Sequence, residues 1–282
     1  MDVRRAAVWE MPSRRLFRRT FAYTVRGSCG GWHLRQNVAE EHLVHLTSWL
    51  AEPFRIPVSC IFKRADDRII FRWQPEREGL DWVVKAYYSR TWRRWLRERR
   101  RAYAESISQL CAERRGLRTP AACGYGHLRL GAQRCVFICG QHIPLPSLRE
   151  CFRQRPDPDG VAALLDRAGA MLRKLYCAGC NHVDFGPHAM LISAASPDGD
   201  VLIDFESASF LRRPSLRAFA AQAGYFAWSV ATNRDWVEPQ VVEQWFAGLL
   251  QSFDRRDDST LWDIWRKCFR DRQSLQWRTS VR

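Results

Sequence analysis

The sequence predicts an α+β fold in which strands dominate up to about residue 138 and helices dominate after it. Residues 57–62, 68–73 and 81–88 read as strands separated by turns, which predicts a three-stranded antiparallel meander. Beyond residue 210 only helical patterns are visible, over residues 214–232, 239–253 and 261–275. We therefore expect three parts: a basic extension over 1–50, a small β-rich part over 51–140 and a larger helical part over 141–282.

The charge of the chain points to acidic partners. The formal net charge is +15, and only Lys63, Lys85, Lys174 and Lys267 are lysines, so nearly all positive charge is arginine. Arginine suits bidentate contacts with phosphate and carboxylate groups, as in a phosphorylated glycolipid or an anionic membrane face. No helix-turn-helix, zinc or RNA-reading motif accompanies this charge, so we expect no nucleic-acid partner.

The sequence shows neither a membrane-spanning run nor the apolar segment of a signal peptide, which predicts a cytoplasmic protein. Its ten cysteines are scattered through apolar stretches, as expected for small core residues. Cys177 and Cys180 form a CxxC, but no second pair completes a zinc site. In the first 21 residues, arginines interleave with apolar side chains. This suits either a segment resting on anionic lipid or a solvated extension.

Lys85 lies in the apolar strand Trp-Val-Val-Lys-Ala-Tyr-Tyr and needs an anionic partner, because an unpaired ammonium is costly to bury. The following helix, expected over residues 91–115, offers Glu98 and Glu105. Glu105 stands next to the apolar stripe of that helix, whereas Glu98 is embedded among arginines that neutralise it. We therefore predict that Lys85 pairs with Glu105 and not with Glu98.

The stretch from residue 180 to 210 is the most informative in the chain. Apolar runs at 189–193 and 201–203 flank the turn-rich segment 196–200, which predicts a strand hairpin. Asp184 stands before the hairpin and Asp204 closes its second strand. Antiparallel pairing would bring the two carboxylates to the same end of the hairpin, the arrangement that phosphoryl transfer from ATP requires.

His182-x-Asp184, followed by a strand, a turn and Asp204-Phe205-Glu206, resembles the catalytic loop and metal-binding segment of protein-kinase-like enzymes. The string NHVDFGPHAMLI is most similar to the lipopolysaccharide core kinases, the Kdo and heptose kinase group. The resemblance covers roughly residues 54–225. It implies a two-lobed protein-kinase-like fold with a small β-rich N-lobe and a larger helical C-lobe, joined by a hinge near residues 139–146 that binds adenine.

By this resemblance the cofactors are ATP and Mg²⁺, and the acceptor is a sugar, Kdo or heptose, of the lipopolysaccharide inner core or linked to lipid A. It also implies a monomer, peripheral on the inner face of the inner membrane. Six residues take roles: Asp184 deprotonates the sugar hydroxyl, His182 braces the loop, Lys85 contacts the phosphates, Glu105 orients Lys85, Asp204 holds Mg²⁺ and His188 assists it.

Two departures from the kinase pattern are visible. Ala189 stands where kinases carry the asparagine that ligates a second Mg²⁺, and the turn at residues 65–67 holds no glycine to cover phosphates. His188 offers an imidazole beside Ala189, although imidazole is a poorer Mg²⁺ ligand than oxygen donors. The rival interpretation is a pseudokinase, a binding module with weak or no phosphotransfer.

Overall fold

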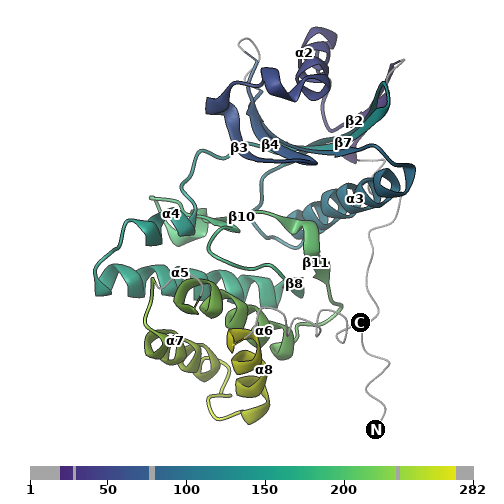
Figure 1. Ribbon diagram of the computed structural model, residues 1–282. Coiled ribbons are helices and arrows are strands. Elements are labelled where there is room, and N and C mark those ends of the chain that lie inside the picture. Colours follow the sequence, from purple (N-terminus) through teal and green to yellow (C-terminus); the bar gives the residue numbers. More distant parts are fainter. Residues whose placement is uncertain (1–19, 28–29, 76–79, 233–235, 271–282) are drawn as a thin grey trace. The chain divides into compact units, whose positions relative to one another are not determined.

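The computed structural model describes residues 20–27, 30–75, 80–232 and 236–270 (Figure 1). They form two compact units, each with its own core. The sheet unit comprises residues 20–110 and 120–144, and the helical unit comprises residues 111–119 and 145–270. The predicted order of strands first and helices later is confirmed.

The sheet unit is built on a seven-stranded antiparallel sheet with strand order β1-β2-β6-β7-β5-β4-β3. The predicted meander is confirmed as β3-β4-β5, although β3 begins at residue 61 because residues 58–60 form a 3-10 turn. The strands are β1 Tyr23–Gly27, β2 Gly30–Leu34, β3 Ile61–Ala65, β4 Arg68–Trp73, β5 Trp82–Ser89, β6 Ala122–Leu130 and β7 Gln133–Gln141.

The sequence pattern did not reveal β1, β2 or β6. In β6 the reason is glycine, which weakens the strand pattern but is needed for packing. A Cβ on Gly126 would lie 2.3 Å from the ring of Phe137 on β7. Gly124 makes room in the same way for Leu34 on β2.

Each face of the sheet is covered by one helix. α2, Glu40–Ala51, buries Leu43, Leu46 and Leu50 in the cluster that contains Phe71 and Trp73. α3, Trp92–Arg114, buries an apolar stripe on the opposite face. There it packs with Tyr87, Tyr125 and Val136. The strand neighbours of Tyr87 and Val136 belong to the first cluster, as the alternation of side chains along a strand requires. The alternation of β5 thus fixes which face Lys85 occupies.

Helices dominate the helical unit, as predicted. They are α4 Leu148–Arg153, α5 Pro158–Cys177, α6 Leu216–Ala227, α7 Pro239–Gln251 and α8 Ser259–Arg270, with a π-helical stretch at Trp228–Thr232. α4 begins with a capping box between Ser147 and Glu150, as its sequence suggests. The helices share one apolar core around Phe226, Phe246 and Trp265.

Four short strands in the helical unit carry the segment around residues 180–210: β8 Cys180–His182, β9 Met190–Leu191, β10 Val201–Leu202 and β11 Ala208–Phe210. β9 pairs with β10, and β8 pairs with β11, both antiparallel. The predicted hairpin is therefore confirmed as β9–β10, with a 3-10 turn at Pro197–Gly199 between its strands.

Several predictions concern residues outside the described ranges, among them the arginine-rich segment at residues 4–19, the turn at 78–79 and the end of the last helix beyond 270. The described residues from 20 to 50 contribute β1, β2 and α2. β1 and β2 belong to the seven-stranded sheet, and α2 packs in its core. The predicted boundary at residue 50 does not separate these elements from the sheet unit in the structure. None of the described helices has the length and apolar character to cross a bilayer.

Candidate functional site

Lys85 and Glu105 form an ion pair within the sheet unit. The Lys85 ammonium, on β5, lies 2.6 Å from the Glu105 carboxylate on α3. The Lys85 side chain is 18% exposed and that of Glu105 only 4%, so the pair is largely withdrawn from water. Burial raises the pKa of the neighbouring Tyr87 to about 12, and the negative charge of Glu105 adds to this shift. The predicted pairing is confirmed.

Glu98 is also buried, but its partners differ. Its carboxylate lies 3.0 Å from Arg97 and 3.6 Å from Arg101, both on the same helix. The local arginines therefore neutralise Glu98, as the sequence indicated. The two glutamates of α3 thus have different partners: Glu105 pairs with Lys85, and Glu98 pairs with arginines of its own helix.

The carboxylate part of the candidate site lies in the helical unit, around His182 at the end of β8. Its ring nitrogen Nε2 donates to the carbonyl of Ile203 at 3.0 Å, which joins the segment holding Asp184 to the residue before Asp204. The backbone N–H of His182 donates to the side chain of Gln222, a buried residue of α6. His182 is therefore held by hydrogen bonds at both its backbone and its side chain.

Burial and the charges of two aspartates, Asp184 and Asp204, act in opposite directions on the pKa of His182. The imidazole is 1% exposed, and burial lowers its pKa. The negative charges of Asp204 and Asp184 act in the opposite direction without cancelling that effect. Both carboxylates are thus near enough to act on one neutral imidazole, while their own side chains are partly exposed. This is the juxtaposition that the hairpin predicts.

Asp204 adopts an unusual backbone conformation, with φ 67° and ψ 61°. This left-handed region is uncommon for a residue with a side chain, although aspartate and asparagine tolerate it better than most. The following 3-10 turn, Phe205–Ser207, begins directly after it. Phe205 is buried, and its ring lies 5.4 Å from that of His182. Strained residues of this kind cluster at functional sites.

His188 and Ala189 differ sharply in accessibility. The His188 side chain is exposed, and after burial, the main cause, its positive charge also acts to lower the pKa of His182. Ala189 is fully buried. Its carbonyl accepts a hydrogen bond from Ile203 N at 2.9 Å. Kinases carry a second metal ligand at this position. In this chain the residue there is a buried alanine whose backbone carbonyl hydrogen-bonds to Ile203.

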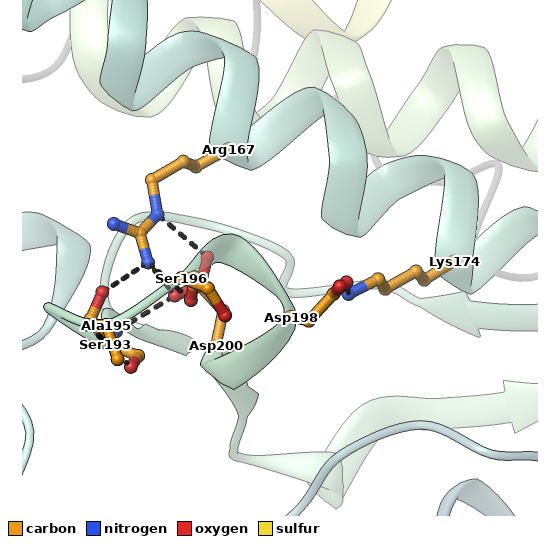
Figure 2. Close-up of polar contacts among 7 residues, drawn as sticks. All are labelled: Arg167, Lys174, Ser193, Ala195, Ser196, Asp198 and Asp200. Atoms are coloured by element: carbon orange, nitrogen blue, oxygen red, sulfur yellow. Dashed lines mark hydrogen bonds and ion pairs between the residues drawn. The ribbon is translucent and has the colours of Figure 1, made fainter.

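A brace that the sequence did not reveal fixes the turn between β9 and β10 (Figure 2). Arg167 of α5 bonds both carboxylate oxygens of Asp200, which is 2% exposed, and donates to the carbonyl of Ser193 at 2.7 Å. Asp200 in turn accepts from Ser193 N at 2.9 Å. The turn is thus tied to a long helix, and the position of the hairpin strands follows from it.

The oxygen donor that the sequence assigns to Mg²⁺ is the carboxylate of Asp204. Among the described residues no group of three or more His, Cys, Asp or Glu side chains is arranged to hold a metal ion. Mg²⁺ is commonly held by one or two carboxylates together with substrate phosphates and water. The partly exposed carboxylate of Asp204 meets that requirement, whereas Ala189 supplies no ligand atom.

Two of the solved structures that are similar to this chain illustrate the likeness. One, "WaaP in complex with acyl carrier protein", has a TM-score of 0.48 and 20% identity, and the match covers 78% of this chain and 86% of that one. The other, "ROP18 kinase domain in complex with AMP-PNP and sucrose", has a TM-score of 0.46 and 12% identity, with 78% and 79% covered. No curated protein matches the sequence significantly.

The family model described as "Lipopolysaccharide kinase (Kdo/WaaP) family" matches residues 76–236, more than half of the chain. The matched span contains Lys85, Glu105, His182, Asp184 and Asp204. The family resemblance drawn from the sequence is therefore confirmed. The sheet unit and the helical unit confirm the predicted α+β class, with its β-rich and helical parts. The chain belongs to the lipopolysaccharide kinase (Kdo/WaaP) family.

Proposed function

We propose that this member of the lipopolysaccharide kinase family transfers the γ-phosphate of ATP to a hydroxyl of a sugar, Kdo or heptose, in the lipopolysaccharide inner core. The observation that carries the proposal is the 2.6 Å pair between Lys85 and Glu105. A lysine held at a strand by a buried glutamate is a group that kinases use to hold nucleotide phosphates. The family match supports the acceptor class.

In this proposal Asp184 accepts the proton of the sugar hydroxyl as its oxygen attacks the γ-phosphorus and ADP leaves. His182 keeps Asp184 in place, because its imidazole is neutral and hydrogen-bonded to the Ile203 carbonyl. Lys85 contacts the α- and β-phosphates. Asp204 would hold Mg²⁺, with His188 as a weaker ligand, and the ion would supply positive charge against the phosphates.

The test is incubation of the protein with labelled ATP, Mg²⁺ and purified lipopolysaccharides of defined core structure. Transfer of label to a core that carries an unmodified Kdo or heptose hydroxyl is expected, and cores lacking that sugar serve as the control. Mass spectrometry of the labelled sugar would identify the hydroxyl that accepts the phosphate. No transfer to any core, despite Mg²⁺-dependent binding of ATP, would instead indicate the pseudokinase.

The pseudokinase interpretation rests on Ala189, which offers no second metal ligand. A nucleotide-binding module would keep Lys85, Glu105 and Asp204 but would not need a base at Asp184. Calorimetric titration of ATP with and without Mg²⁺, run beside the transfer assay, separates the two functions.

We also propose that the chain works as a monomer at the anionic surface of the inner membrane, on the side where ATP is available. The net charge of +15 supports this, since anionic lipid attracts clustered basic residues. Co-sedimentation with anionic and neutral vesicles, repeated at rising salt, tests the proposal. Binding to anionic vesicles alone, weakening with salt, is expected.

A further inference from the structure

A cavity of about 660 Å³ lies within the sheet unit, and neither Lys85 nor Glu105 lines it. Its walls come from β1, β2, β6, β7 and the first turns of α3. Six residues define its character: Arg26, Arg99, Arg129, Arg134, Trp92 and Trp95. This cavity was not predicted, because three of the strands that form its walls, β1, β2 and β6, were not predicted.

The charge in this cavity is unbalanced. The lining contains four arginines and no Asp or Glu side chain. Nearby arginines of α3 do have acidic partners, since Arg94 pairs with Asp67 and Arg97 pairs with Glu98. Across the part of the chain that the structure describes, no ion pair joins the cavity arginines to a carboxylate. Their charge is therefore available to a ligand.

Aromatic rings hold two of these arginines at the wall. The Arg99 guanidinium lies 5.3 Å from the centre of the Trp95 ring, and that of Arg134 lies 5.9 Å from the Trp92 ring. The two indoles are stacked on each other, 4.7 Å apart. Arginines stacked on rings lose less conformational entropy when they bind a ligand than freely moving ones do. Trp92 itself is 55% exposed and offers a flat apolar surface.

The cavity also contains a buried hydrogen-bond donor with no acceptor. Trp95 is only 7% exposed, and within the described residues its indole N–H has no hydrogen-bond partner. An unsatisfied buried donor is rare and costly in proteins. Burial lowers the pKa of His127 and His33, and the charge of Arg99 lowers both further. The surroundings of the Trp95 N–H are thus positively charged.

We propose that this cavity is a second binding site, separate from phosphoryl transfer, for a ligand that carries phosphate groups. The arginines would contact phosphate oxygens in pairs, the Trp95 N–H would donate to another oxygen, and the exposed face of Trp92 would contact the part of the ligand next to the phosphate. Two sources share this chemistry: a soluble diphosphate and the phosphomonoester headgroup of a lipid.

The test uses the full chain and compares two double variants of equal charge. Arg99→Gln with Arg134→Gln alters the cavity, whereas Arg93→Gln with Arg100→Gln alters exposed arginines of α3 that do not line it. Inorganic pyrophosphate is titrated calorimetrically, with Lys85→Met introduced throughout to weaken binding at the proposed nucleotide site. We expect the cavity variant to lose about tenfold or more in affinity, because charged hydrogen bonds are lost, and the control to bind as the parent does.

The lipid source is tested with phosphatidylcholine vesicles that contain or lack phosphatidic acid. If a headgroup is the ligand, the cavity variant binds the phosphatidic acid vesicles less well than the control variant does. Trp95→Phe keeps an aromatic side chain and removes the indole N–H, and it should weaken binding of the effective probe when measured well below the melting temperature of the variant. Equal losses in cavity and control variants, or no binding of either probe by the parent, would overturn the proposal.

Discussion

The ammonium of Lys85 and the carboxylate of Glu105 meet at 2.6 Å, although 20 residues separate them in the sequence. Because Glu105 fixes the lysine, Lys85→Met should reduce phosphate transfer by roughly a hundredfold or more, the scale for losing one preorganised electrostatic contact. Glu105→Gln should raise the KM for ATP with a smaller effect on kcat. Glu98→Gln is the matched control and should leave the KM for ATP unchanged. A larger effect from Glu98 than from Glu105 would contradict the assignment.

Asp184 and Asp204 both influence the His182 imidazole, but their replacement should have different effects on ATP binding and on transfer. Asp204→Asn removes the carboxylate proposed to hold Mg²⁺, so both Mg²⁺-dependent ATP binding and transfer should be lost. Asp184→Asn should leave ATP binding intact while transfer falls about a hundredfold or more, the scale of losing a general base. Calorimetry and transfer assays on both variants check this. Equal losses of ATP binding would show that the roles are wrongly assigned.

Ala189→Asn restores the residue type that kinases use for a second metal ion. From the sequence, this change would leave activity unchanged or raise it. The structure argues against a gain, because Ala189 is fully buried and an added amide would overpack the site at a cost of about 1–3 kcal/mol. We expect a lower melting temperature and no rise in kcat, with Ala189→Ser as the smaller control. A stable Ala189→Asn variant with higher kcat would contradict this.

Arg167→Ala should destabilise the helical unit strongly. It would leave the buried carboxylate of Asp200 without its partner, and breaking such pairs costs about 3–5 kcal/mol. Lys174→Ala, on the same helix, removes a contact with Asp198, which is 93% exposed, and should cost under about 0.5 kcal/mol. Urea unfolding of both variants measures the difference. Similar midpoints would show that the brace contributes little.

The stability of the protein should depend on pH through the carboxylate of Asp81. Arg72 donates to both its carboxylate oxygens at 2.7 Å, and the His142 ring lies 3.0 Å from one of them. Burial alone would raise the pKa of Asp81, but these hydrogen bonds outweigh it and lower the pKa below its usual value. The resulting stabilisation is present above the unfolded-state pKa near 3.9 and is lost as the pH falls through the lower folded-state pKa.

Asp81→Asn should therefore destabilise the protein by about 1 kcal/mol at pH 6, because the site is partly exposed. The difference between Asp81→Asn and the parent should shrink towards pH 3. Urea midpoints at the two pH values provide the measurement. A difference that stays constant across this range would rule out the linkage.

The sequence allowed a correct prediction where a buried charged residue required a partner and few partners were available. Lys85 in an apolar strand required an acid, and the register of one helix decided between Glu105 and Glu98. It failed for Arg167 and Asp200, because an arginine on an amphipathic helix and an aspartate in a turn are ordinary surface residues until the fold buries them. It also missed the cavity, whose walls come from three stretches that are far apart in the chain, residues 24–33, 92–99 and 127–134.

Among the described residues, two separate stretches belong to the helical unit, because residues 111–119 are part of it although they precede residues 120–144 of the sheet unit. Arg115 donates to the carbonyls of Ala178 and Leu211, and the carbonyl of Arg118 accepts from Leu202 on β10. A fragment starting at residue 145 would lack these partners. Fragment complementation should therefore require a peptide that spans residues 111–119, and limited proteolysis at one site should not release an independently stable helical unit.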